Sequence, residues 1–248
     1  MLRMQFEKRR RKTNLVNLMS KFKSFFTRDN LKSKLKAFFE DCFKMPIRLM
    51  IYPLRGYEEF KYENKSKNYV SIFYLIMMII VQVIAFNGDG FLVNKNNPKD
   101  FNLLMTVALI LFPVAIFVFA NWATTALMDG KGNMSQIFRV ITYSFFPYVW
   151  MSLLASIISN YITVDEMVFF TALRTVGLAL LVYMLFFGML GIHEYGLFKT
   201  VLMFVFTVVA IAIILFIILL FFSLIQQVYA FAKSLYDEFV MRFLVWTR

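Results

Sequence analysis

Apolar residues are gathered into five long runs, each close to the length needed to cross a lipid bilayer. A membrane-spanning helix needs about 20 mostly apolar residues. The runs cover residues 69–87, 103–127, 136–158, 167–192 and 201–225. Short segments rich in Gly, Asp and Asn separate them, which is typical of turns. The pattern predicts an all-α, polytopic membrane protein with a five-helix transmembrane bundle.

The third run is the least regular of the five. Pro147 lies inside it, and Arg139, Thr142, Tyr143 and Ser144 interrupt its apolar sequence. Because proline removes a helical hydrogen bond, a re-entrant segment is the alternative interpretation, and it would change the number of spans. The fifth run contains fifteen consecutive apolar residues, VVAIAIILFIILLFF, and is the clearest span.

Both ends of the chain are amphipathic outside these runs. In the N-terminal segment, apolar residues recur at three- and four-residue spacing between lysines: Leu15, Leu18, Met19, Phe22, Phe25 and Phe26, then Leu35, Phe38, Phe39, Cys42, Phe43 and Ile47. The C-terminal stripe consists of Val228, Phe231, Leu235, Phe239, Phe243 and Trp246. Such patterns predict interfacial helices. We therefore divide the chain into a basic cytoplasmic segment (1–68), a transmembrane domain (69–227) and a C-terminal interfacial helix (228–248).

Charge is concentrated in the N-terminal segment. Residues 1–68 contain 18 of the 27 basic residues and 7 of the 15 acidic ones. The positive-inside bias then predicts a cytoplasmic N-terminus, cytoplasmic loops at 128–135 and 193–199, and an external C-terminus. Anionic lipid headgroups are the expected partner of the basic arm, rather than nucleic acid. The alternative is that its apolar stripes pack on one another or on a partner subunit.

Signals for catalysis are weak, and we expect no catalytic residue, metal site or cofactor. There is one cysteine, Cys42, and one histidine, His193, which is interpreted as an interfacial polar group beside Glu194. The Asp129-Gly-Lys-Gly132 segment lacks the glycine and the Ser or Thr of a phosphate-binding loop. Its glycines are expected to permit a tight reversal between the second and third spans.

Three polar residues lie at membrane depth and mark candidate functional positions. Gln82 and Asn121 could form hydrogen bonds to neighbouring helices. Arg174 is expected to extend to the external interface, or to pair with Asp165, with Glu166 or with an acidic group on a partner.

Two motifs resemble those of a known family. The first is Ala120-Asn-Trp-Ala-Thr-Thr-Ala-Leu-Met-Asp-Gly-Lys-Gly132, followed by Thr142-Tyr-Ser-Phe-Phe-Pro-Tyr148. The second, Pro53-Leu-Arg-Gly-Tyr-Glu-Glu-Phe60, precedes the first span. Together they resemble the Yip family, membrane proteins first named for interaction with Ypt/Rab GTPases. The resemblance marks eight residues as a partner or turn motif: Asn121, Trp122, Asp129, Gly130, Lys131, Gly132, Tyr143 and Pro147.

The resemblance implies five spans, a cytoplasmic N-terminus and an external or lumenal C-terminus. The composition, rich in Lys, Phe, Ile and Asn, is typical of a bacterial member, located in the cytoplasmic membrane. Some bacterial members look like neighbours of sugar-type ABC permeases. We therefore expect a non-enzymatic scaffold or accessory subunit that binds another membrane protein, such as an ABC permease, or a second copy of itself.

Two other functions stay open at this point. One is an independent transporter or channel for a small solute or ion, centred on Arg174, Gln82 and Asn121. The other is a lipid-binding, membrane-shaping protein that uses its N-terminal arm.

Overall fold

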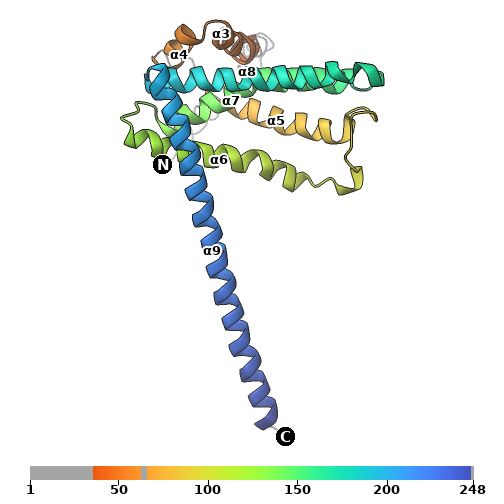
Figure 1. Cartoon of the computed structure of the whole chain (residues 1–248), viewed down its shortest axis with the longest axis vertical. Coiled ribbons are helices and arrows are strands. Elements are labelled where there is room, and N and C mark those ends of the chain that lie inside the picture. The colour runs from red at the N-terminus through yellow and green to blue at the C-terminus, as the bar shows by residue number, and fades with distance from the viewer. Residues whose placement is uncertain (1–35, 63–65, 247–248) are drawn as a thin grey trace, which may run out of the picture. The chain divides into compact units, whose positions relative to one another are not determined.

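The computed structural model describes residues 36–62 and 66–246 of the chain. The chain divides into two compact units, Met1–Gly56 and Tyr57–Arg248. Every regular element in the described residues is helical, and five helices are long and apolar enough to cross a membrane (Figure 1). The prediction of an all-α, polytopic membrane protein is therefore confirmed. The predicted amphipathic stripe at residues 15–26 lies outside the described residues.

The described part of the first unit, residues 36–56, consists of short helices. These are η1 (Glu40–Lys44), α3 (Met45–Ile51) and the beginning of α4 (Pro53–Tyr62). Cys42 is fully buried in this unit, whereas Phe39 is 58% exposed. The described part of the predicted apolar stripe, residues 38–47, is thus divided between packed and exposed positions. Burial, reinforced by the charge of Asp41, raises the pKa of the Cys42 thiol to about 11, so the thiol stays protonated at neutral pH.

The five apolar helices of the second unit lie close to the predicted runs. They are α5 (Asn68–Gly88), α6 (Leu103–Leu127), α7 (Met134–Ile158), α8 (Met167–His193) and α9 (Leu197–Trp246). The alternative of a re-entrant third segment is wrong, because α7 continues through Pro147 without a break. One missing hydrogen bond within a long packed helix is tolerated in this position.

Helix α9 is much longer than a span. Its 50 residues correspond to about 75 Å of helix, whereas the hydrocarbon core of a bilayer is about 30 Å thick. The helix passes through residues 227 and 228 without interruption, so the predicted C-terminal segment continues the fifth span (Figure 1). Five residues of its apolar stripe are exposed: Val228, Phe231, Leu235, Phe239 and Phe243.

Helix α7 is the centre of the packing. It packs against α5 and α8, while α9 packs mainly against α6. In the most apolar stretch of each helix, 61% of the residues of α7 are buried but none of those of α9. Glycines of α8 allow the close approach, because a Cβ atom on Gly177 would lie 2.9 Å from the Cβ of Met151 on α7.

The connecting segments meet in pairs at opposite ends of the helices. At one end, the backbone N–H of Gly90 donates to Ser159 Oγ at 2.8 Å. At the other end, the backbone N–H of Gly132 donates to His193 Nδ1 at 3.2 Å. The loops after α5 and α7 therefore share one end, and those after α6 and α8 share the other, as alternating spans require. We refer to the second as the motif end.

Candidate functional site

The motif end brings together most of the residues that carry the family resemblance. Asn121 and Trp122 lie in the last two turns of α6, and residues 128–133 form the turn that leads into α7. His193 ends α8, and the segment that follows it faces this turn. The candidate site is therefore a junction between α6, α7, α8 and α9.

A buried hydrogen-bond network links Asn121 to His193. Asn121 is fully buried and His193 is 1% exposed. Since His193 Nδ1 accepts from the Gly132 N–H, the proton of a neutral ring is on Nε2, which lies 3.3 Å from Asn121 Oδ1. Asn121 Nδ2 donates to Thr207 Oγ1 of α9 at 3.1 Å. The interpretation of His193 as an interfacial group is wrong, because both ring nitrogens are used inside the protein.

The two motif glycines are required by this histidine. A Cβ atom on Gly130 would lie 2.6 Å from Tyr195 Oη and 2.7 Å from His193 Nδ1. A Cβ atom on Gly132 would lie 2.7 Å from His193 Cε1. Neither glycine has a positive φ; the left-handed residue of the turn is Asp129, with φ of 56°. The expected reason for the glycines, a tight reversal, is therefore replaced by close packing against an imidazole ring.

Tyr195 stacks on the ring of His193. Its ring is stacked on His193 at 5.4 Å between centroids, and its hydroxyl donates to the Met128 carbonyl at 3.2 Å. The ammonium of Lys199 lies 4.5 Å from the centroid of the tyrosine ring. Tyr195 thus closes the turn against the beginning of α9.

Glu194 is the charged centre of the motif end. It adopts a left-handed conformation, with φ of 57°, at the C-cap of α8, directly after His193. Its carboxylate accepts hydrogen bonds from Lys131, from Lys61 at 2.7 Å and from Tyr62. These donors, Lys131 first, hold the pKa of the Glu194 carboxyl at about 2. The same bond to Glu194 raises the pKa of Lys131. One carboxylate thereby joins the end of α4, the glycine turn and the start of the α8–α9 connection.

Two aromatic residues of the segment before the first span, Tyr57 and Phe60, pack on α8 and α7. Tyr57 is fully buried and donates from its hydroxyl to the Met184 carbonyl of α8 at 2.9 Å. Phe60 contacts Tyr143 edge to face, with centroids 5.1 Å apart. The Tyr143 hydroxyl accepts from the backbone N–H of Lys67 at 3.0 Å. Tyr143, the motif tyrosine of α7, thus contacts the segment that precedes the first span.

The remaining motif residues have different surroundings. Pro147 is buried in α7, a turn beyond Tyr143. Trp122 is 49% exposed, although its neighbour Asn121 is buried. The Lys131 side chain is 66% exposed. Some motif residues are therefore buried within the protein, and others are exposed on its surface.

Arg174 lies at the opposite end of the helices and forms an ion pair that the sequence pattern does not predict. Its guanidinium donates to Asp89, in the loop after α5, at 2.8 Å, and stacks over Phe170 at 4.6 Å. Asp89 also accepts from Ser156 of α7 at 2.6 Å. The expected pairing with Asp165 or Glu166 is wrong, because the guanidinium reaches the loop after α5 and pairs with Asp89 there. The one available signal was the Gly88-Asp-Gly90 sequence at the end of the first span.

The three polar residues proposed for transport are not gathered around one pathway. Gln82 is exposed on α5. Asn121 lies at the motif end, whereas Arg174 is near the start of α8, about 28 Å along that helix from His193. In residues 36–62 and 66–246, no group of three or more His, Cys, Asp or Glu is arranged to hold a metal ion.

The junction described above is built from the motifs that first resembled the Yip family. A family profile named Yip1 domain matches residues 47–240, which is more than half of the chain. A search of the curated proteins and a search of the solved structures each found no match. Because the matched range contains the complete junction, helices α5 to α8 and all but the last six residues of α9, this chain belongs to the Yip1 domain family of membrane proteins.

Proposed function

We propose that the protein is a non-enzymatic scaffold or accessory subunit of a bacterial cytoplasmic membrane, and that it binds another integral membrane protein. In this proposal the motif end faces the cytoplasm, with the N-terminus, and the C-terminus is external. The charge distribution along the sequence supports this orientation, since 18 basic residues precede the first span.

The observation that carries the proposal is the division of the motif end into an inside and an outside. Its polar groups, including Asn121, His193 and Glu194, are occupied by bonds within the chain. Large apolar side chains at the same end are exposed: Trp122 (49%), Leu127 (88%), Leu197 (63%) and Phe198 (78%). All four lie within the last two turns of α6 or the first turn of α9, at the border of the membrane, and an exposed tryptophan at a protein contact often contributes most of the binding energy.

The proposed partner is a permease of the sugar-type ABC class. This choice rests on the family resemblance, whose bacterial members include chains that look like neighbours of such permeases. The long exposed surface of α9 provides a second face on which a polytopic partner could pack, because no residue in its most apolar stretch is buried by this chain.

Co-purification in mild detergent tests the proposal. We expect the full-length chain to recover a second integral membrane protein in a fixed ratio, and Trp122→Ala to reduce that recovery at least about tenfold, as loss of a hot-spot tryptophan does. Phe112→Ala is the matched control, because Phe112 is an aromatic residue of the same helix with 50% exposure. A monodisperse homo-oligomer that moves a solute across liposomes would contradict the proposal.

A further inference from the structure

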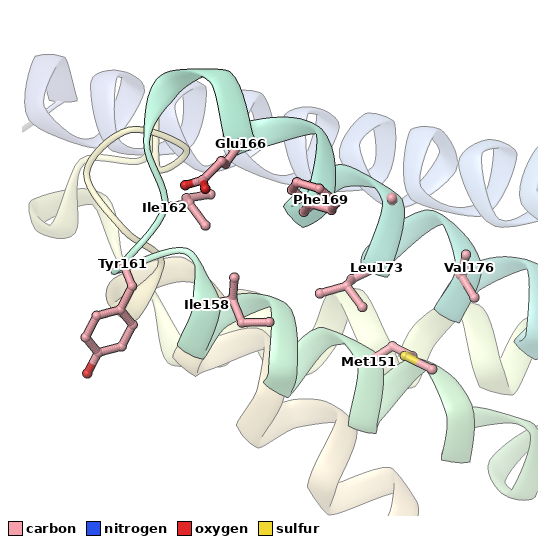
Figure 2. Close-up of a pocket in the computed structure, with 9 residues that line it drawn as sticks. Met151, Ile158, Tyr161, Ile162, Glu166, Phe169, Leu173 and Val176 are labelled. Atoms are coloured by element: carbon pink, nitrogen blue, oxygen red, sulfur yellow. The ribbon is translucent and has the colours of Figure 1, made fainter.

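A groove opens between α7 and α8 at the end opposite the motif. Its volume is about 640 Å³, within the range of roughly 300–1,000 Å³ that is usual for small-molecule sites. Ile158 of α7 and Leu173 of α8 point into it from opposite walls (Figure 2). Deeper in the membrane, the helices approach again where Gly177 meets Met151. The groove is therefore a lateral gap between the close contact at Gly177 and the loop after α7.

One charged side chain lies at the loop end of this apolar groove. Among the described residues that line it, Glu166 alone carries a charge at neutral pH. Its carboxylate accepts from the backbone N–H and the hydroxyl of Thr163, at 2.9 and 3.0 Å, and both bonds use Oε2. The carboxylate is thus held in place by two hydrogen bonds while Oε1 can accept from a ligand. The neighbouring cation, Arg174, is already paired with Asp89.

We propose that this groove binds one phospholipid whose headgroup carries an ammonium, with the ammonium on Glu166 and an acyl chain along α8. The positions match the layers of a bilayer. Glu166 immediately precedes α8, at the level of headgroups, whereas Leu173 and Val176 lie about 10–15 Å deeper along the helix. Leu173, Val176 and Phe169 offer apolar contact to an acyl chain, and the carboxylate offers a charge-assisted hydrogen bond to the ammonium.

A second groove of this chain provides an internal comparison. It lies between α5, α6 and α7, has a volume of about 630 Å³ and is lined by residues such as Leu111 and Ala115. The described residues that line it include no carboxylate and no cation. An acyl chain can enter both grooves, but only the groove at Glu166 can distinguish one headgroup from another.

Native mass spectrometry of the full chain in mild detergent tests the proposal. The probes are phosphatidylethanolamine and phosphatidylglycerol with identical acyl chains. We expect about tenfold stronger retention of the first lipid, as one charge-assisted hydrogen bond provides. Glu166→Gln keeps the shape of the side chain and should make the two lipids equal. Leu173→Trp fills the groove and should abolish retention of both at this site.

Two control variants separate the proposed site from general effects. Leu178→Trp places the same bulk on the exposed side of α8, where Leu178 is 52% exposed, and should leave the preference unchanged. Ala115→Trp fills the second groove and should also leave it unchanged. Equal retention of both lipids by the wild-type chain, or a preference that survives Glu166→Gln, overturns the proposal. So does loss of the preference in either control, or a photo-crosslink from residue 173 to a protein instead of a lipid.

Discussion

Helices α7 and α9 differ both in hydropathy and in burial, and the more apolar helix is the less buried of the two. Helix α9 is the most apolar of the five, yet none of its most apolar stretch is buried. Helix α7 is the least apolar, and 61% of the corresponding stretch is buried. In a bilayer, apolar side chains are as well solvated by lipid as by protein, so they do not need to pack. A helix that carries polar and small residues must find protein neighbours.

The polar residues of α7 show how this requirement is met. Thr142 and Ser144 are fully buried and donate to backbone carbonyls one turn earlier, at 3.0 and 2.8 Å. Ser156 donates to Asp89 at 2.6 Å, and Tyr143 accepts from Lys67. Ser156 and Tyr143 thus connect α7 to the segments before and after α5, whereas Thr142 and Ser144 form their hydrogen bonds within α7 itself.

The largest expected effect is the loss of an aromatic residue from α7. Tyr143→Ala removes a fully buried side chain, its contact with Phe60 and the hydrogen bond from Lys67. We expect the free energy of unfolding in mixed micelles to fall by about 3 kcal/mol. Phe216→Ala is the control in α9, where the ring is 61% exposed, and should cost less than about 0.5 kcal/mol. Equal losses would remove the contrast between the two helices.

A smaller loss is expected from added volume at the α7–α8 contact. The Cβ atom of Gly188→Ala would overlap Val140 of α7 and lie 3.0 Å from the ring of Tyr57. We expect a loss of about 2 kcal/mol, measured as a lower thermal midpoint in detergent. In contrast, Gly196→Ala meets no atom within 4 Å and should leave the midpoint almost unchanged. A stable Gly188→Ala protein would show that α7 and α8 are less tightly packed than described.

Removal of the charge that ties α7 and α8 to the first loop should have a moderate effect. Asp89→Asn deprives Arg174 of its anion, but the arginine side chain is 30% exposed and partly solvated. We expect a loss of about 1 kcal/mol in unfolding free energy. Asp165→Asn, an exposed position in the next loop, is the control. If the two variants behave alike, the Asp89–Arg174 pair contributes nothing to the link between these helices.

The smallest effect concerns Glu194, outside the spans. The pKa of its carboxyl is about 2 in the folded protein, against an ordinary value of 4.5. Its contribution to stability is therefore present above the ordinary value and is lost as the pH falls from about 4.5 to about 2. Thermal midpoints measured across this window should decline less for Glu194→Gln than for the wild-type chain. Parallel declines would mean that the carboxylate adds no pH-dependent stability.

The sequence predicts the helices better than their contacts. Apolar run length gave all five spans, because lipid requires each span to be apolar over about 20 residues. It did not give the partner of Arg174, since Asp89 lies 85 residues away in a loop whose fold depends on Ser156. Apolar run length also did not predict the burial of His193. A polar residue at the end of a span can form hydrogen bonds either to water or to a buried side chain such as Asn121, and the sequence does not distinguish the two. The left-handed Glu194 has no local sequence signal.

The extent of α9 was also only partly predictable. A span ends in sequence where hydropathy falls, and Gln226 and Gln227 follow the fifth run. These two glutamines have ordinary helix propensity, so the helix continues beyond them. Hydropathy therefore defines where the membrane segment ends, but not where the helix ends.

The polar groups of the Yip1 domain hold its helices together, and we propose that exposed apolar residues such as Trp122 contact another membrane protein. Photo-crosslinking in native membranes, with a photoreactive phenylalanine analogue at position 122 or 149, distinguishes these two roles. Trp122 is 49% exposed on α6, and Val149 is fully buried in α7. We predict that position 122 crosslinks to a second integral membrane protein and that position 149 gives only crosslinks within the chain. Recovery of lipid alone from position 122 would show that this surface faces the bilayer, and recovery of a foreign protein from position 149 would show that α7 is not enclosed by its own chain.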